Sequence, residues 1–271
     1  MNSKFDLSGR TAVITGGSGV IGSVIAKELA MAGVKVAVIG RNKDALKTVT
    51  DQIKKAGGSA IFCTADVLDR DSLEKAKEFI QGQFGKLDIL INGAGGNDVR
   101  ATTSETLSFF DIETDNMRSV FDLNVMGAIL TTQVFGRFFA ESNKGCVINI
   151  SSMAAFHPLT KTVAYSAAKA AVSNFTQWMA VHFNQNYSPA IRVNAIAPGF
   201  LLTSQNRFLM LKEDGSLTER GKKVLKKTPM GRFGEPEELV GAVLWLCSDA
   251  ASFVNGAVIP IDGGFSAYWG I

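Results

Sequence analysis

Tyr165 and Lys169 are the two residues of this sequence whose types and spacing are best suited to chemistry. They stand four positions apart in an alanine-rich stretch that predicts a helix, so both side chains share one helix face. A phenol has an ordinary pKa of about 10 and is a poor acid at neutral pH. A cation on the same face favours the phenolate, so we expect Lys169 to lower the pKa of Tyr165.

Two further features support a catalytic role for this pair. Ser152 follows the apolar run Cys146–Ile150 and stands thirteen residues before Tyr165. A glycine-rich turn, Thr15–Gly22, follows the first apolar run. At a junction between a strand and a helix, such a turn lets the backbone approach a pyrophosphate, whose charge the helix N-terminus favours. Tyr and Lys at this spacing occur in helices by chance, but the three features together predict a catalytic site beside a dinucleotide.

The elements that would position these residues follow from the alternation of apolar and amphipathic stretches. Predicted strands are Thr11–Thr15, Lys35–Ile39, Ser59–Thr64, Leu87–Ile91, Cys146–Ile150, Ala190–Ala195 and Ala257–Ile261. Predicted helices are Ile21–Ala32, Lys43–Ala56, Asp71–Phe84, Asp115–Glu141, Ala164–Asn186 and Glu235–Ser248. The apolar runs lack a two-residue alternation, which is typical of a parallel sheet buried on both faces. We therefore predict an α/β fold: a Rossmann-type, doubly wound, seven-stranded parallel sheet with helices on both faces, in a single domain over residues 1–271.

The composition narrows the class of protein. A net charge of +3 without a basic run gives no reason to expect a nucleic-acid partner. Cys63, Cys146 and Cys247 are scattered and form no C-x-x-C pair, which favours a reducing compartment. No apolar stretch is typical of a secretory signal or a membrane span, and the two His and three Cys are too far apart for a metal site. We expect a cytoplasmic protein without a membrane partner or a bound metal.

Two other stretches are expected near a nucleotide. Glycines in Asn92–Gly96 follow the fourth predicted strand, where the backbone can approach a flat ligand at the switch point of the sheet, although an ordinary turn has the same composition. Asp66 and Val67 follow the third predicted strand. The Asp66 carboxylate could accept a hydrogen bond from an adenine amine, or cap the next helix, or do both.

The end of the second predicted strand bears on the choice of cofactor. An acidic residue there would bind the ribose hydroxyls of NAD and repel the 2′-phosphate of NADP. This chain has Gly40, followed by Arg41 and Asn42. The Arg41 guanidinium can pair with a phosphate, although a surface arginine in a turn is the alternative. We predict that NADP(H) is favoured and that NAD(H) use is retained.

The segment 199–232 interrupts the alternation of strands and helices. It is long, rich in Lys and Arg, and contains a turn at residues 213–216. Long loops in compact domains often cover a site, so we expect a substrate lid, with a solvated surface helix and loop as the alternative.

With these motifs in place, the chain resembles the short-chain dehydrogenase/reductase family over essentially its whole length. The resemblance implies that Ser152 holds the substrate oxygen, that Tyr165 exchanges its proton, and that Lys169 binds the nicotinamide ribose and lowers the pKa of Tyr165. It also implies that Asn124 holds a water linking Lys169 to solvent. The cofactor-binding residues implied or expected are Gly16, Ser18, Gly19, Val20, Ile21, Arg41, Asn42, Asp66, Val67, Asn92, Gly93, Ala94, Gly95, Tyr165, Lys169, Pro198, Gly199 and Thr203.

One position departs from the family pattern. Val20 stands where the family usually has Gly, and Gly19 stands one position earlier. Because Val does not adopt a positive φ without strain, we expect a slightly reshaped turn.

Within this family the chain resembles the fructuronate reductases, also called D-mannonate oxidoreductases. The stretches that carry this likeness are 92–97, 149–153, 173–178, 228–234 and 262–268. The resemblance implies interconversion of D-fructuronate and D-mannonate, a sugar-acid substrate, and a homotetramer whose apolar tail, Phe265–Ile271, packs at an interface.

A sugar acid needs a partner for its carboxylate. Candidates are Asn97, Arg100, His157 and Arg207, beside Ser152 at the reacting oxygen. A structural role for the histidine and a surface role for the two arginines are the alternatives. Two other functions stay open: reduction of another ketone such as a 3-oxoacyl thioester, and nucleotide binding without turnover. Asn124, Ser152, Tyr165 and Lys169 together speak against the latter, because a pure binder does not need all four.

Overall fold

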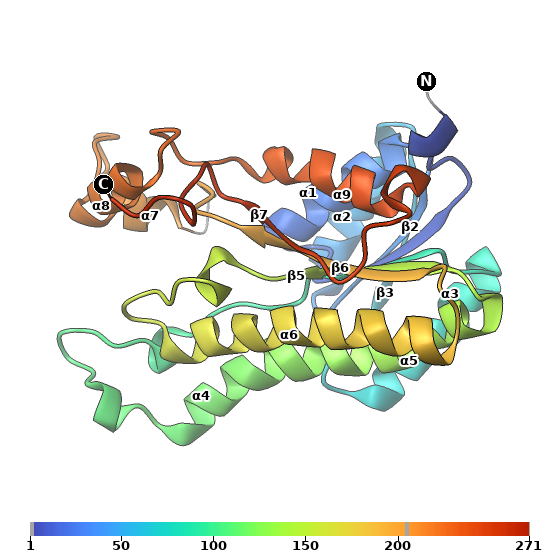
Figure 1. The fold of residues 1–271 in the computed structure, drawn as a ribbon, viewed down its shortest axis with the longest axis horizontal. Helices are drawn as coiled ribbons and strands as arrows, with labels where there is room; N and C mark the ends of the chain where they lie inside the picture. Colours follow the sequence, from blue (N-terminus) through green and yellow to red (C-terminus); the bar gives the residue numbers. More distant parts are fainter. Residues whose placement is uncertain (1–2, 204–205, 271) are drawn as a thin grey trace.

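The computed structural model describes residues 3–203 and 206–270. Seven strands form one sheet in the order β3-β2-β1-β4-β5-β6-β7, and every neighbouring pair is parallel (Figure 1). The strands are β1 (Thr11–Thr15), β2 (Lys35–Gly40), β3 (Ser59–Thr64), β4 (Ile89–Asn92), β5 (Gly145–Ile150), β6 (Ile191–Pro198) and β7 (Val258–Ile261). The predicted fold class is confirmed.

Helices cover both faces of the sheet (Figure 1). One face carries α1 (Val20–Met31), α2 (Lys43–Lys55) and α9 (Val240–Cys247), and the other carries α3 (Arg70–Phe84), α5 (Gly127–Ser142) and α6 (Val163–Asn186). Neighbouring strand residues point to opposite faces, so Ile14 packs in the core under α1 while Val13 packs in the core under α5. Both cores are apolar, which is why the strands appear in the sequence as largely apolar runs, with buried polar residues such as Arg192 and Asn194 of β6 as exceptions.

Three further helices lie around the carboxyl ends of the strands. These are α4 (Thr114–Phe121), α7 (Arg207–Met210) and α8 (Glu219–Lys227). The last two belong to the segment 199–232 and lie beside the C-terminal residues (Figure 1). Within the described ranges, no helix combines the length and the apolar character needed to cross a bilayer.

The predicted helix Asp115–Glu141 is interrupted. Between α4 and α5 lies a π-helical turn, Asp122–Met126. There the side-chain amide of Asn124 donates to the Val120 carbonyl at 2.8 Å, which is the acceptor that the Asn124 backbone would use in a regular α-helix. Such wider turns are frequent at functional sites.

Candidate active site

A cleft of about 440 Å³ lies at the carboxyl ends of the strands, where the chain leaves β1 and β4 in the middle of the sheet. This is the switch point at which doubly wound sheets bind ligands. Its walls come from the glycine turn after β1, residues 93–96 after β4, residues 150–153 after β5, Tyr165 and Lys169 on α6, and the segment after β6.

The glycine turn is shaped for a closely approaching anion. Gly16 has a φ of 63°, and a Cβ there would lie 2.7 Å from the Gly93 carbonyl oxygen. Gly19 is the N-cap of α1 and makes no side-chain cap bond, so the first amides of that helix receive no side-chain acceptor from the cap. A pyrophosphate fits such a helix terminus. Gly16, Gly19, Val20 and Ile21 all line the cleft.

That Val20 reshapes this turn relative to the family pattern stays a prediction. Val20 is the first residue of α1, and among the described residues Asn143 is the only non-glycine with a positive φ. Because the turn places its left-handed residue at Gly16, a β-branched side chain is tolerated at Val20.

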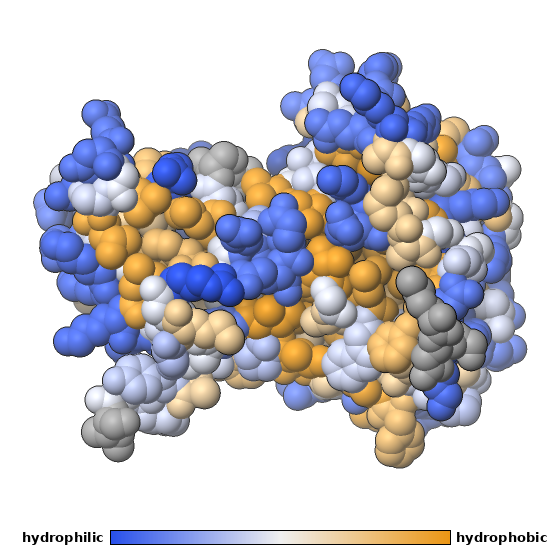
Figure 2. Space-filling view, turned by 90° about the horizontal axis from the view of Figure 1, so that it is seen from above, coloured by the Kyte–Doolittle hydropathy of each residue, from blue (hydrophilic) through white to orange (hydrophobic). Residues whose placement is uncertain are grey.

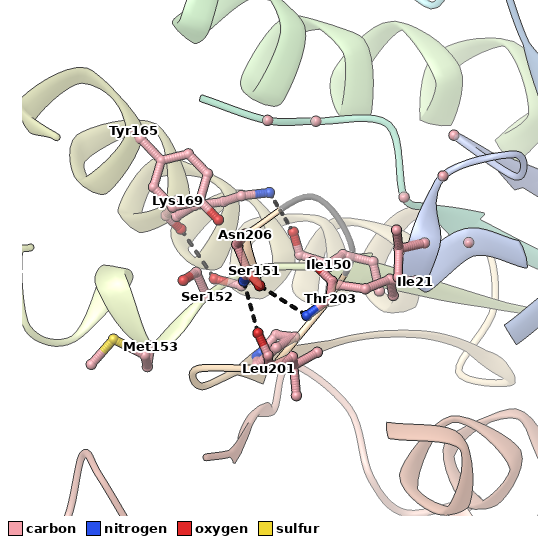
Figure 3. Close-up of a pocket in the computed structure, with 18 of the residues that line it drawn as sticks. Ile21, Ile150, Ser151, Ser152, Met153, Tyr165, Lys169, Leu201, Thr203 and Asn206 are labelled. Atoms are coloured by element: carbon pink, nitrogen blue, oxygen red, sulfur yellow. Dashed lines mark hydrogen bonds between the residues drawn. The ribbon is translucent and has the colours of Figure 1, made fainter. Parts of the chain in front are cut away.

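Tyr165, Ser152 and Lys169 come together in the cleft (Figure 3). The side chains of Ser152 and Tyr165 are hydrogen-bonded. Lys169 is buried, with its Nζ donating to the Ile150 carbonyl at 2.8 Å and lying 5.6 Å from the centre of the Tyr165 ring. The helical spacing on α6 and the end of β5 therefore bring together the three residues that the sequence singled out.

The pKa of Tyr165 moves in the direction opposite to the expected one. Burial raises the pKa of Tyr165, and the hydrogen bond with Ser152 offsets part of that rise. Burial also lowers the pKa of Lys169 to about 8. The expected lowering by Lys169 fails because desolvation penalises the phenolate and weakens the charge on Lys169 itself.

Asn124 holds the loop that forms the cleft wall. Its Oδ1 accepts a hydrogen bond from the Gly96 amide, and its Nδ2 donates to the carbonyls of Gly96 and Val120. Its side chain therefore binds protein groups with both polar atoms. The role of Asn124 in holding a water stays a prediction.

Several residues expected at the cofactor lie outside the cleft walls. Asn92 is buried, and its Nδ2 donates to Thr132 and Asn149, away from the cleft. The Asn42 side chain caps α2 by accepting from the Ala45 amide. Asp66 accepts from the Leu68 amide, and Asp69 rather than Asp66 caps α3. The other residues in this group are Ser18, Arg41 and Val67.

Arg41 is exposed at the end of β2. Next to it, Gly40 has no steric need to be glycine, because a Cβ there would meet Leu46 and Ser18 at an ordinary 3.5 Å. The remaining expected residues, Gly93, Ala94, Gly95, Pro198, Gly199 and Thr203, line the cleft. These walls suit a dinucleotide, and we expect its pyrophosphate at the glycine turn.

None of the four carboxylate candidates lines the cleft. Asn97 donates to Thr102 at 2.9 Å, and Arg100 pairs with Asp98 at 2.7 Å. His157 makes a 3.1 Å hydrogen bond with the Ser266 carbonyl. Arg207 is exposed on α7.

The segment after β6 contributes residues that the sequence did not single out. Phe200, Leu201 and Asn206 line the cleft, as do Met153 and Leu159. Asn206 fastens this wall, since it accepts from the Thr203 amide at 2.8 Å and donates to the Leu201 carbonyl at 2.8 Å (Figure 3). Nothing in the local sequence pattern marks these residues, because irregular segments have no periodicity.

Comparisons with known proteins agree with this geometry. A family model described as enoyl-(acyl carrier protein) reductase matches residues 17–266. The chain is 51% identical over 275 residues to UxuB of Bacillus subtilis strain 168, an uncharacterized oxidoreductase, with 98% of each chain covered. It is 45% identical to a crystal structure from Haemophilus influenza that holds NAD and is provisionally named a D-mannonate oxidoreductase, with a TM-score of 0.93 and 98% of each chain covered. A gluconate 5-dehydrogenase from Burkholderia cenocepacia J2315, in complex with NADP and tartrate, is 30% identical, with a TM-score of 0.87 and 98% of each chain covered.

Proposed function

The chain belongs to the short-chain dehydrogenase/reductase family and is an NAD(P)-dependent oxidoreductase, and we propose that it interconverts D-fructuronate and D-mannonate. The observation that carries the proposal is the meeting of Ser152, Tyr165 and Lys169 in a cleft that the glycine turn also lines. The choice of substrate is supported by the likeness to the Haemophilus structure.

The chain's residues have separate tasks in this reaction. The nicotinamide, when bound, supplies or accepts the hydride. Tyr165 donates its phenolic proton to the ketone oxygen during reduction, and its raised pKa keeps that proton in place until it is needed. Ser152 donates a hydrogen bond to the same oxygen, where negative charge develops.

Lys169 acts on the cofactor and on Tyr165 and not on the substrate. It would bind the nicotinamide ribose, for which its position in the cleft wall is suitable. With a pKa of about 8 it exchanges its proton near neutral pH, so it can return a proton to the Tyr165 oxygen after turnover. Asn124, through Gly96, keeps the facing loop at the distance that this arrangement needs.

For the cofactor we propose a preference for NADP(H), with NAD(H) also used. Gly40 supplies no carboxylate to repel a 2′-phosphate, and the exposed Arg41 guanidinium follows directly. The relatives include one structure with NAD and one with NADP.

Two further proposals concern the segment 199–232 and the assembly. The first part of the segment already forms a wall of the cleft, which supports a role as a substrate lid. Trp269 is 83% exposed in the single chain, which supports burial of the tail in a homotetramer.

The substrate is tested by incubating the purified protein with NADH or NADPH and a panel of ketones while following the absorbance of the reduced cofactor. Preferential reduction of D-fructuronate supports the proposal. Equal or better activity on acetoacetyl thioesters favours the alternative, a reductase of 3-oxoacyl thioesters. Absence of turnover with every ketone favours a nucleotide-binding protein without catalysis.

A further inference from the structure

A second cavity, of about 660 Å³, adjoins the cleft at the end of the molecule that carries α8 and the C-terminal residues. Its walls are residues 157–162, part of α8, and residues 265 and 268–270. Leu159 and Phe200 line both cavities, so the two spaces meet at these apolar side chains. Figure 2 shows strongly hydrophilic residues beside apolar ones at this end of the molecule, on the left.

The walls of this cavity carry positive charge. Five cations line it, and we call the cavity the basic pocket: Lys161, Arg220, Lys223, Lys226 and Lys227. No Asp or Glu is among the residues that line it. Uncompensated charges of one sign around a cavity attract ligands of the opposite sign.

Three of the cations on α8 share the helix face that lies toward the pocket. Arg220, Lys223 and Lys227 stand at i, i+3 and i+7, on the face that also carries the buried Val224. Lys222 does not line the pocket and binds Glu219 at 2.8 Å. Within the described part of the chain, none of the five lining cations is in an ion pair.

Thr162 also lies in the wall of the pocket. Thr162 is 8% exposed, and its Oγ1 is buried without a hydrogen-bond partner among the described residues. It is also the N-cap of α6 but makes no side-chain cap bond. Because this oxygen has almost no accessible surface, a ligand would bind the charges of the pocket and not this hydroxyl.

The position of the pocket relates it to the reaction. The glycine turn, residues 93–96 and residues 198–203 would surround the cofactor, so the cofactor would take much of the cleft. A substrate whose ketone oxygen lies at Ser152 and Tyr165 then needs room beyond the cleft. The shared walls, Leu159 and Phe200, lead from there to the basic pocket.

We propose that the basic pocket is the specificity site for the anionic end of the substrate, which it holds through carboxylate or phosphate oxygens. The proposal rests on the proposed function and extends it, since the ketone would react at Tyr165 while α8 and residues 157–162 bind the anion. Of the four carboxylate candidates, His157 is the one that lines this pocket.

The test compares charged and neutral ketones in matched variants. The variant is the triple substitution Arg220→Gln, Lys223→Gln and Lys227→Gln, and the control is Lys222→Gln on the same helix. We expect the triple variant to raise the KM for D-fructuronate about tenfold or more, since charged hydrogen bonds are lost. The KM for D-fructose, which is neutral, should change less than about twofold on the same principle. D-fructose 6-phosphate separates a phosphate site from a carboxylate site.

A binding measurement keeps this test independent of turnover. Trp269 lines the pocket, so its fluorescence should respond to D-mannonate but not to neutral D-mannose, and Trp269→Phe identifies its signal. The response should weaken in the triple variant and persist in Lys222→Gln. Equal affinities of wild type and triple variant for D-mannonate, or an equal rise in KM for charged and neutral ketones, would overturn the proposal.

The two proposals can fail separately. If D-fructuronate is not reduced but D-mannonate still binds in a charge-dependent manner, the proposed reaction is wrong and the anion site stands. If D-fructuronate is reduced with a KM that the triple substitution leaves unchanged, the reaction stands and the anion site is wrong.

Discussion

Asn124 and Gly96 exchange two hydrogen bonds: the Gly96 amide donates to Asn124 Oδ1 at 3.1 Å, and Asn124 Nδ2 donates to the Gly96 carbonyl at 2.7 Å. These bonds fasten the loop after β4 to the π-helical turn. The neighbouring Gly95 is so close that a Cβ there would lie 2.7 Å from Asn124 Oδ1 and 3.2 Å from Lys169 Nζ. Asn124 is thus a positioning residue that sets the spacing between this loop and Lys169.

Gly95→Ala should destabilise the protein and reduce its activity. The added methyl must displace Asn124 or Lys169, and overpacking of this kind costs about 1–3 kcal/mol. Gly96→Ala is the matched control for stability, because nothing lies within 4 Å of a Cβ at that position. Thermal unfolding of both variants measures the difference, and equal midpoints would show that the loop adjusts without strain.

Tyr165→Phe should abolish turnover while cofactor binding is retained. Only the hydroxyl is removed, and general acid catalysis typically contributes about 10²–10⁴-fold. Steady-state rates give the loss, and fluorescence titration with NADPH shows whether the cofactor still binds. A rate within about tenfold of wild type would end the assignment of Tyr165 as the proton donor.

Lys169 should make stability depend on pH in the alkaline range. Its folded pKa of about 8 lies below its ordinary value of 10.5. Between these values the unfolded chain binds a proton that the native protein has lost, so raising the pH stabilises the native state. The free energy of unfolding of wild type should rise relative to Lys169→Met over this interval, by at most about 3 kcal/mol.

Unfolding free energies of both proteins at pH 7 and pH 10 check this prediction. Below pH 8 the buried ammonium reduces the stability of wild type. The unfolding free energy of wild type minus that of Lys169→Met should therefore be smaller at pH 7 than at pH 10. A difference between the two proteins that stays constant with pH would contradict a lowered pKa for Lys169.

Arg41→Ala should weaken NADPH binding and leave NADH binding nearly unchanged. A charge-assisted hydrogen bond contributes about 1.5–3 kcal/mol, and exposure of Arg41 favours the lower end. Gly40→Asp should shift preference toward NADH, because a Cβ at this position makes only ordinary contacts and a carboxylate repels the 2′-phosphate. Dissociation constants of the variants for NADPH and NADH test both predictions. If Arg41→Ala loses equal affinity for the two cofactors, Arg41 does not bind the phosphate.

The exposed tail predicts self-association. Tyr268 and Trp269 are 45% and 83% exposed in the single chain, and burial of such side chains in a homotetramer would stabilise it. Light scattering at micromolar concentration should give the mass of a tetramer. The mass of a monomer would contradict the assembly.

Much of the fold could be predicted because its determinants are local. The strands Thr11–Thr15 and Ser59–Thr64 have the predicted bounds. The first is buried at every position, and a strand buried on both faces is a largely apolar run in the sequence. The Tyr165–Lys169 pair shares a helix face because four residues make about one turn. The predicted helix Asp115–Glu141 fails at Asn124, whose side chain binds Gly96, a partner that lies 28 residues away.

The sequence by itself determined the chemistry: which groups can donate a proton, hold an anion or let the backbone approach a phosphate. Only the tertiary structure decided their environment. Desolvation depends on every layer packed around a group, so the rise in the pKa of Tyr165 could not be derived from its neighbour Lys169. In the same way, the basic pocket joins α8 to residues 157–162, which are distant in sequence, and the packing of the fold brings their charges together.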